Sequence, residues 1–504
     1  MRPNFSTQVQ YQTTQNWQDL TAHGLLIAVW QFADACGAFE LWGQVKYRMK
    51  KVDYSALDKL KTLWLSIIAG CDHTVEINDK LGGHEKALAH LCGLKRFPDQ
   101  SQINRLLQKT EEEQVEQWRS AHHQLLARFS RAHRQDLWLT LNDGSRLLVA
   151  DIDQRALAVN GKKFELAAPG YFGRKRARRG YQLTALFLGG AISEVVDEYL
   201  DPGDTPMGRR LPELLDRLVW LCGQLNLHPS QVLVRGDAQL GTPAMIVNVE
   251  QHGFHYLFKG LSSQRAKKLT QQADDIFWRV KPGSEGQQRW MCDLGWIKHL
   301  DQSKEGRGKS ITARTLAQVR TERVKTPRPG AHRSRLQKSL VKVKHDYYLT
   351  DLSPAQMPIQ EVLHIYDDRA TIERYFYDEQ YSLGAQQVRT RHFQGEALFQ
   401  LIVSTTNNLL RWMQHQIFQQ TTLEEIGLKR LIHRAMQIPA RITQQGNQWV
   451  VEFPHQHYLI KKLEKEWVAL SPSDSTRPRQ PDQSPSNQVH LPTVGGVGRR
   501  YWSH

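Results

Sequence analysis

The sequence predicts an α/β protein in which helices flank a mixed β-sheet, with a helical region in front of the sheet. Three observations support this fold class. Apolar residues recur at helical spacing up to residue 132, strand-like runs alternate with helices after residue 137, and hydrophobic residues make up 40% of the chain. At about 150 residues per domain, the 504 residues leave room for several domains.

The first region, residues 1–135, is predicted to be helical. A helix over residues 57–68 carries leucine, isoleucine and tryptophan at helical spacing, and Gly70 follows as a stop. His122 and His123 are adjacent. We expect them to lie on a solvated helix face rather than to bind a metal ion.

Two further short helices are expected at residues 84–92 and 100–108. Asp99 and Gln102 have the spacing of a capping box at the start of the second one. The pair would suit a helix-turn-helix that reads the DNA major groove. An ordinary helical bundle fits the same pattern, so both interpretations stay open.

Strand patterns begin after residue 135 and form the predicted sheet. A turn at residues 142–145 joins the first two, and a helix over 211–225 separates the earlier strands from the later ones. The strands are expected at residues 137–141, 146–152, 157–159, 181–188, 192–200, 232–234 and 254–259.

Residues 260–345 interrupt this pattern and are interpreted as a β-rich insertion that ends in a very basic run over 304–344. Trp290 and Trp296 lie in it, and we expect a core role for both rather than stacking on a flipped base. Long helices are predicted from residue 359 to about residue 418. The predicted domains are 1–135 (helical, DNA-binding), 136–259 with 346–440 (the sheet domain), 260–345 (the insertion), 441–470 (a C-terminal segment) and 471–504 (a disordered tail).

The charge balance favours a polyanionic partner. Lysine and arginine number 67 against 51 acidic residues, a formal net charge of +16. Five cysteines, with no C-x-x-C pair, disfavour both a disulfide framework and a structural zinc site. Without a signal peptide or a membrane-length apolar run, the chain is expected in a reducing cytoplasm. No P-loop motif is present, so no nucleotide cofactor is expected.

Carboxylates follow two of the predicted strands. Asp151 and Asp153 end an apolar strand, and their spacing of two residues places them on one face. Asp237 follows the strand over 232–234, at a sheet rim that a ligand can reach. Each of them also suits a turn or a cap.

A third polar group is predicted to be helical. Tyr366, Arg369, Glu373 and Gln380 are spaced so that all four fall on one stripe of a continuous helix. Such a stripe makes a poor core seam. It fits either a solvated face or a site in which the arginine and tyrosine bind phosphate beside a carboxylate.

In this order and spacing the residues resemble the DDE transposases of bacterial insertion sequences, in the branch with a Y-x2-R-x3-E-x6-K signature. Tyr366, Arg369 and Glu373 match its first three letters, and Gln380 stands where lysine is expected. The segment 235–241 is similar to the family's R-x-D-x-x-[FY]-G, with leucine in place of the aromatic residue. The first aspartate usually opens D-x-T, a threonine missing here, so Asp151 and Asp153 remain alternatives and Asp153 is favoured.

The resemblance implies a ribonuclease-H-like catalytic domain that uses two Mg²⁺ or Mn²⁺ ions. Asp153, Asp237 and Glu373 would be the catalytic metal ligands, with Asp151 as a further candidate ligand. It implies an enzyme that cuts double-stranded DNA at terminal inverted repeats and transfers the ends to target DNA, working as a homodimer or a larger assembly. An inactive transposase-derived DNA-binding protein and a structure-directed nuclease of the same fold are the alternatives.

Two groups of side chains are predicted to contact DNA. The signature positions Tyr366, Arg369 and Gln380 would hold the scissile strand. Basic clusters in a loop and in the insertion would track the phosphate backbone: Arg174, Lys175, Arg176, Arg178, Arg179, Arg320, Arg323 and Lys325.

Overall fold

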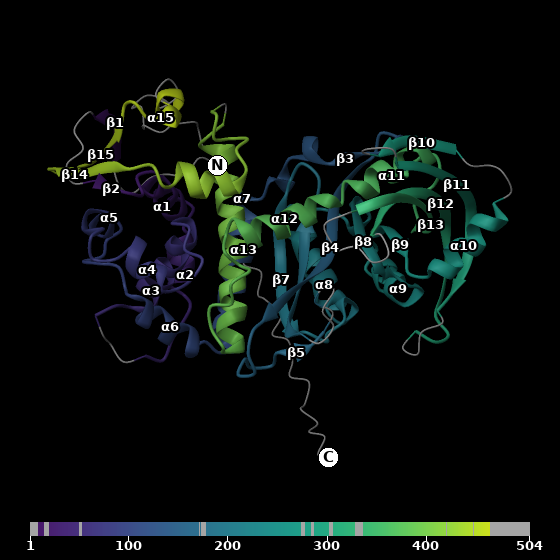
Figure 1. The fold of residues 1–504 in the computed structure, drawn as a ribbon, viewed down its shortest axis with the longest axis horizontal. Coiled ribbons are helices and arrows are strands. Elements are labelled where there is room, and N and C mark those ends of the chain that lie inside the picture. Colours follow the sequence, from purple (N-terminus) through teal and green to yellow (C-terminus); the bar gives the residue numbers. More distant parts are fainter. Residues whose placement is uncertain are drawn as a thin grey trace, which may run out of the picture.

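The computed structural model confirms a mixed α/β architecture with a large sheet on one side and a helical region on the other (Figure 1). Between the two stands the long helix α13, Phe393–Gln416, which contacts α3, α6 and α7 of the helical region and strand β7 of the sheet. The structure describes residues 9–14, 20–49, 53–170, 172, 178–273, 278–283, 287–301, 306–327, 336–419, 421–446 and 448–463. The predicted tail, 471–504, lies outside these residues.

The N-terminal region is helical, as the apolar spacing predicts. Helix α3 begins at a capping box on Ser55 and is followed by Gly70 at φ +75°. Asp99 caps α6 by accepting from the backbone N–H groups of Ser101 and Gln102. The helices are α1 (Leu26–Ala35), α2 (Ala38–Trp42), α3 (Ala56–Ile68), α4 (Glu76–Lys80), α5 (Lys86–Leu91), α6 (Gln100–Gln108) and α7 (Glu112–Phe129).

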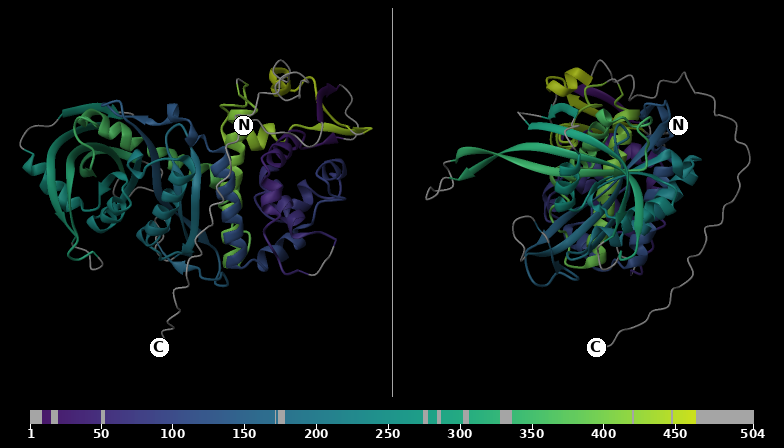
Figure 2. Two further views of the ribbon diagram at one scale, coloured as in Figure 1. Left: turned by 180° about the vertical axis from the view of Figure 1, so that it is seen from behind. Right: turned by 90° about the vertical axis from the view of Figure 1, so that its right-hand side faces the viewer.

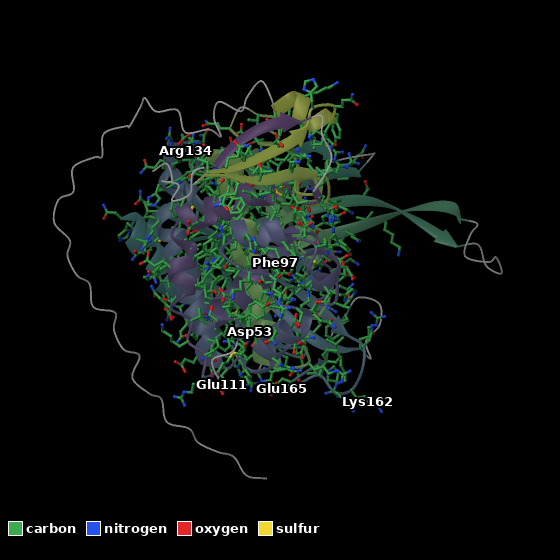
Figure 3. All side chains as sticks on the ribbon, turned by 90° about the vertical axis from the view of Figure 1, so that its left-hand side faces the viewer. Asp53, Phe97, Glu111, Arg134, Lys162 and Glu165 are labelled. Atoms are coloured by element: carbon green, nitrogen blue, oxygen red, sulfur yellow. The ribbon has the colours of Figure 1, made fainter. Side chains whose placement is uncertain are left out.

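Helix α7 corrects one expectation. It follows Glu111 and ends five residues before Arg134. Figure 3 shows Glu111 near the bottom of the molecule and Arg134 near the top. His122 and His123 are buried, not solvated, because α7 packs against both α13 and β7. His122 contacts Thr405 Oγ1 at 3.1 Å and the Val195 carbonyl at 3.2 Å.

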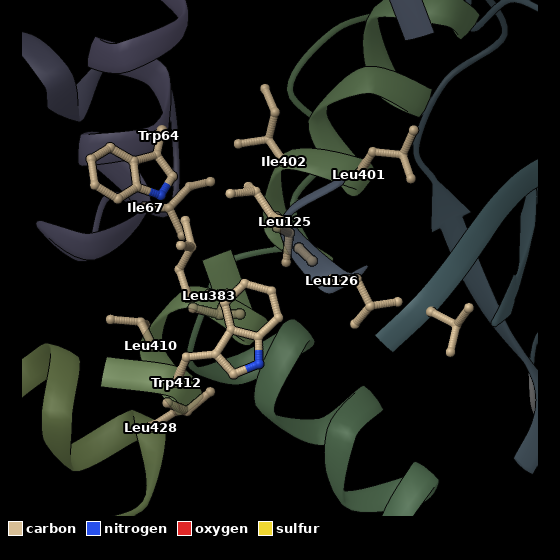
Figure 4. Packing of buried hydrophobic residues seen from close by; sticks show 14 of the residues in the cluster. Trp64, Ile67, Leu125, Leu126, Leu383, Leu401, Ile402, Leu410, Trp412 and Leu428 are labelled. Carbon is tan, nitrogen blue, oxygen red and sulfur yellow. The ribbon is translucent and has the colours of Figure 1, made fainter. Parts of the chain in front are cut away.

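Buried apolar residues join the helical region to α13 and to the sheet. Tryptophans of three helices lie close together, with Trp42 and Trp118 stacked at 4.8 Å between ring centroids. Figure 4 shows Leu401 and Ile402 of α13 beside Trp64 and Ile67 of α3 and beside Leu125 and Leu126 of α7. Burial of apolar surface contributes roughly 25 cal/mol per Å². The packing around α13 therefore stabilises the contact between the helical region and the sheet.

Within the described residues, a sheet of eleven strands has β4, β8 and β9 as parallel neighbours and antiparallel strands on both sides. Helices α8 and α9 cover one face, and α11 and α12 pack on the other. The bounds are β3 (Leu139–Thr140), β4 (Arg146–Val159), β5 (Ala168–Pro169), β6 (Arg179–Leu188), β7 (Glu194–Pro202), α8 (Leu211–Leu225), β8 (Val232–Gly241), α9 (Pro243–Gln251) and β9 (His255–Gly260).

Most strands form where they were predicted, but their bounds differ. Strand β4 joins the two segments expected at 146–152 and 157–159, and β8 continues through Gly241 instead of ending at Val234. The strand expected at 137–141 is reduced to Leu139–Thr140, because a 3-10 turn occupies Gln135–Leu137.

The predicted insertion forms strands that extend the sheet beyond β9. Strands β12 and β13 pair over most of their length and project from the body as a ribbon (Figure 2). Trp296 follows a register irregularity in β11 and is 52% exposed, so the core role predicted for it is wrong. The elements are α10 (Ser263–Gln272), β10 (Trp278–Gly283), β11 (Gln287–Leu300), β12 (Ser310–Pro327) and β13 (Leu336–Thr350).

The helix assumed for the stripe of signature residues, over 366–380, is interrupted. Helix α11, Ile359–Asp367, ends before Asp368 and Arg369, and α12, Ala370–Tyr381, begins after them. The single stripe expected for the four signature residues is therefore wrong. Tyr366 is buried at the end of α11, whereas Glu373 is exposed in the first turn of α12.

A small second sheet pairs the first described strands with the last ones, in the order β1-β15-β14-β2. Its strands are β1 (Val9–Thr14), β2 (Leu20–Thr21), β14 (Ala440–Gln445) and β15 (Gln448–Pro454), next to the short helices α14 (Leu428–Arg430) and α15 (Tyr458–Leu463). Among the described helices, none has the length and apolarity needed to cross a membrane.

Candidate active site

Two rows of polar side chains cross the parallel strands β4 and β8 on the face covered by α11 and α12. The register pairs Asp151 with Arg235 and Ile152 with Gly236, which makes Asp153 and Asp237 the next residues on the two strands. Side chains two apart on a strand share a face. The sheet therefore sets an aspartate–arginine row beside an aspartate–aspartate row.

The first row is closed to solvent. Asp151 is fully buried and accepts two hydrogen bonds from Arg235, Nε to Oδ1 at 2.7 Å and Nη2 to Oδ2 at 2.8 Å. Arg235 also contacts Asp368 at 3.3 Å and donates to the Ile365 carbonyl. Gly189 leaves no room here, because a Cβ on it would lie 2.3 Å from Asp151 Oδ2. This row fixes the α11–α12 junction to the sheet.

The second row is more open, and its two carboxylates repel each other. The Asp153 side chain is 16% exposed. Burial raises the pKa of Asp237, and the negative charge of Asp153 raises it further. The backbone N–H of Gln239 opposes this shift by donating to Asp237 Oδ1 at 2.8 Å.

Arg369 lies over this row and joins it to α12. Its Nη1 donates to Asp153 Oδ2 at 2.7 Å, and its Nη2 to Glu373 Oε1 at 3.3 Å. Burial alone would lower the pKa of Arg369, but the charge and hydrogen bond of Asp153, together with the charges of Tyr366 and Asp151, outweigh burial and raise it. The Glu373 side chain is 65% exposed, so it is free to change rotamer.

Tyr366 closes the site from α11. Its hydroxyl donates to the Gly236 carbonyl at 3.4 Å, and the Arg369 guanidinium lies 5.7 Å from its ring centroid. Burial raises the pKa of Tyr366 to about 12, which keeps the hydroxyl protonated. The structure thus brings together five of the predicted site residues: Tyr366, Arg369, Asp153, Asp237 and Glu373. Asp151 belongs to the closed row instead.

The other predicted DNA contacts lie apart from this group. Gln380 lines a separate cavity of about 380 Å³ between the end of α12 and the far part of β4, with Asn160, Arg178 and two more glutamines. Arg178 and Arg179 are exposed. Arg174, Lys175 and Arg176 lie outside the described residues.

In the ribbon, Arg320 pairs with Asp346 at 2.8 Å. Arg323 and Lys325 belong to β12, opposite Val341 and Ser339 of β13, and their side chains lie outside the description. The DNA contacts expected of these basic residues stay predictions.

Sequence reasoning missed Arg235 as the partner of Asp151, and Asp368 as a second contact of Arg235. A signal was present for Arg235. Leu233, Arg235 and Asp237 alternate on one face of β8, and the polar pair continues an apolar strand. Only the parallel register with β4 shows that Arg235 lies beside Asp151 and that Asp237 lies beside Asp153.

The donor set suits a hard divalent cation, because three carboxylates from β4, β8 and α12 supply only oxygen ligands. Among the described residues, no group of three or more carboxylate, histidine or cysteine side chains lies close enough together to hold a metal ion. Arg369 accounts for the spacing, since its guanidinium stands between Asp153 and Glu373. The single positive charge of Arg369 is shared by these two carboxylates. Burial and the charge of Asp153 raise the pKa of Asp237, so a bound cation would stabilise its ionised form.

Comparison with known families identifies the family of the chain. Residues 18–472 match the family described as transposase DDE domain, group 1, which is nearly the whole chain. No curated protein matches the chain. With a match of this length, the chain belongs to the DDE transposase family.

Proposed function

We propose that this protein cleaves DNA at the ends of its insertion sequence and joins the freed 3′-hydroxyls to target DNA. The observation that carries the proposal is the acidic row. Neighbouring parallel strands and the first turn of α12 bring Asp153, Asp237 and Glu373 around one arginine at the sheet surface. A central antiparallel pair, β4 and β6, followed by parallel β8 and β9, is compatible with a ribonuclease-H-like sheet.

Asp153, Asp237 and Glu373 would be the ligands of two Mg²⁺ or Mn²⁺ ions. Bound there, the ions supply an activated water or 3′-hydroxyl and stabilise the leaving oxygen. Glu373 reaches them by leaving Arg369 and rotating inward, which its exposed position permits. Asp153 is preferred over Asp151 as the first catalytic aspartate, because Asp151 already has both carboxylate oxygens bound to Arg235 in a closed pocket.

Arg369 and Tyr366 would position the scissile strand. Released from Glu373, the Arg369 guanidinium has donors for a phosphate oxygen, and guanidinium–phosphate contacts are strong and directional. Tyr366 keeps its proton near neutral pH and holds the end of α11 against the Gly236 carbonyl. A homodimer or a larger assembly on paired ends completes the proposal.

The test is a cleavage and strand-transfer assay on a labelled duplex that carries the element's own ends, with Mg²⁺ or with EDTA. Wild type is compared with Glu373→Gln and with Glu112→Gln, a control that changes an exposed glutamate in the first turn of α7. The proposal predicts Mg²⁺-dependent 3′-hydroxyl ends that disappear with Glu373→Gln and persist with Glu112→Gln.

Two results would favour the alternatives. Salt-sensitive binding without any cut, in all three proteins, would indicate a transposase-derived DNA-binding protein. Cutting that ignores the terminal sequence and gives no joined product would indicate a structure-directed nuclease.

A further inference from the structure

Helix α12 is fixed to strand β4 at two points, and only the first is part of the acidic site. At the start of the helix, Arg369 pairs with Asp153 of β4. Near its end, Glu379 pairs with Arg155, two residues after Asp153 on the same strand face, at 3.2 Å from Nη2 to Oε2. The polarity is reversed, because the strand supplies the acid at one point and the base at the other.

The second point is buried in a polar network. Arg155 and Glu379 are 6% and 0% exposed. Arg155 Nη2 also donates to Gln400 Oε1 at 3.0 Å, so α13 shares the contact. Glu379 Oε1 accepts from the Tyr375 hydroxyl, and Ser404 lies within 3.4 Å of it.

A second carboxyl from β7 joins the same network. Ser404 Oγ donates to Oε2 of Glu198, and the Tyr375 hydroxyl oxygen lies 3.4 Å from the same Oε2. Oε1 of Glu198 has no hydrogen-bond partner among the described residues. Burial raises the pKa of Glu198 well above the usual range, and the charge of Glu379 adds to the shift. Burial also raises the pKa of Glu379, but the charge of Arg155 and the hydrogen bond from Tyr375 oppose that shift, so Arg155 favours the ionised form of Glu379.

Apolar contacts hold the same side of α12. Tyr375 stacks on Phe187 at 5.1 Å between ring centroids, and Ile372 and Phe376 pack beside it against β6 and β7. These contacts press the helix onto the sheet without fixing its position along the strand. An ion pair with defined geometry does fix it, because a shift of one residue would separate buried charges.

We infer that Arg155 and Glu379 are positioning residues, which hold α12 in the register that places Glu373 over Asp153 and Asp237. The inference rests on the proposed function, since it assigns the pair a role toward the metal-binding carboxylates. Neither residue touches the substrate. Their effect on metal binding must therefore pass through Glu373.

The experiment measures Mn²⁺ affinity by EPR titration of the full chain. The Arg155→Met/Glu379→Gln double variant removes both charges and leaves no buried charge unpaired. It is compared with wild type, with Glu373→Gln, and with all three substitutions combined. Arg210→Met/Asp201→Asn is the matched control, because it removes a 2.7 Å ion pair between β7 and the start of α8.

The expected result is a loss of about tenfold in Mn²⁺ affinity in the double variant, as for outer partners of metal ligands. The loss should vanish when Glu373 is already glutamine, and the control should bind as wild type does. Equal losses with and without Glu373, or no loss at all, would overturn the inference.

Failure of the proposed function gives a different pattern. Wild type that shows this dependence on Glu373 but leaves DNA uncut would contradict the proposed function while supporting the positioning role. Wild type that binds no Mn²⁺ at millimolar concentration would overturn both.

Discussion

Asp151 and Asp153 are two residues apart, share a face of β4 and each pair with an arginine, yet their surroundings differ. Asp151 is fully buried and binds both donors of Arg235, whereas Asp153 is 16% exposed, has one contact to Arg369 and lies beside a second carboxylate. A saturated, closed ion pair is a structural feature. An open carboxylate that shares its arginine and repels its neighbour is poised to exchange partners.

The largest expected effect is a loss of cleavage activity when Asp153, in the open row, is substituted. Asp153→Asn removes a ligand that the metal ions need, so cleavage should fall by about 10³-fold, equivalent to several kcal/mol of transition-state stabilisation. The midpoint of urea unfolding should change little. Single-turnover cleavage at saturating DNA and Mg²⁺ measures the loss, and cleavage close to the wild-type rate would remove Asp153 from the active site.

The second largest expected effect is a loss of folding stability when Asp151, in the closed row, is substituted. Asp151→Asn leaves the buried Arg235 with only its weaker contact to Asp368, which should cost about 3–5 kcal/mol of unfolding free energy. Chemical denaturation followed by far-UV circular dichroism measures this cost. Gly189→Ala crowds the same pocket and should also destabilise the protein. Unchanged stability in both variants would show that the closed row is not structural.

The third prediction concerns the pH dependence of metal binding at Asp237, in the open row. A carboxylate binds metal in its ionised form, so Mn²⁺ affinity should rise with pH through the pKa of Asp237, which burial places above the usual aspartate value. Arg369 lowers this pKa. Arg369→Gln should therefore shift the rise to higher pH, and a shift to lower pH would contradict the assigned geometry.

The smallest expected effect concerns Gln380, at the position where related sequences have lysine. Gln380→Lys adds one positive charge beside Arg178 at the cavity that both line. DNA affinity should rise slightly, and the slope of log affinity against log salt should steepen by about one unit. Fluorescence anisotropy at four salt concentrations tests this, and an unchanged slope would place Gln380 away from the DNA backbone.

Local pattern predicted the elements of the fold better than their partners. The apolar spacing of residues 57–68 predicted α3, and residues 211–225 matched α8 at both ends. The second sheet went unpredicted, because β1 pairs with β15 across more than 400 residues. No pattern within a single short segment contains that pairing.

The site shows the same limit. Spacing and resemblance pointed to Asp153, Asp237, Arg369 and Glu373, which the structure gathers on one face. No proline or glycine lies at the break between α11 and α12, so the local sequence does not predict it. It is held by Arg235 contacting Ile365 and Asp368, and by Arg369 turning toward Asp153. Such tertiary contacts override a helical pattern that runs through both segments.

The most direct test of the distinction between the two rows is a crystal structure of the protein bound to Mn²⁺ and a terminal DNA duplex, with anomalous diffraction locating the ions. We expect anomalous peaks next to Asp153, Asp237 and Glu373, with Arg369 moved onto a phosphate and the Asp151–Arg235 pair unchanged. A peak coordinated by Asp151, or Arg369 still bridging Asp153 and Glu373 with no ion present, would contradict it.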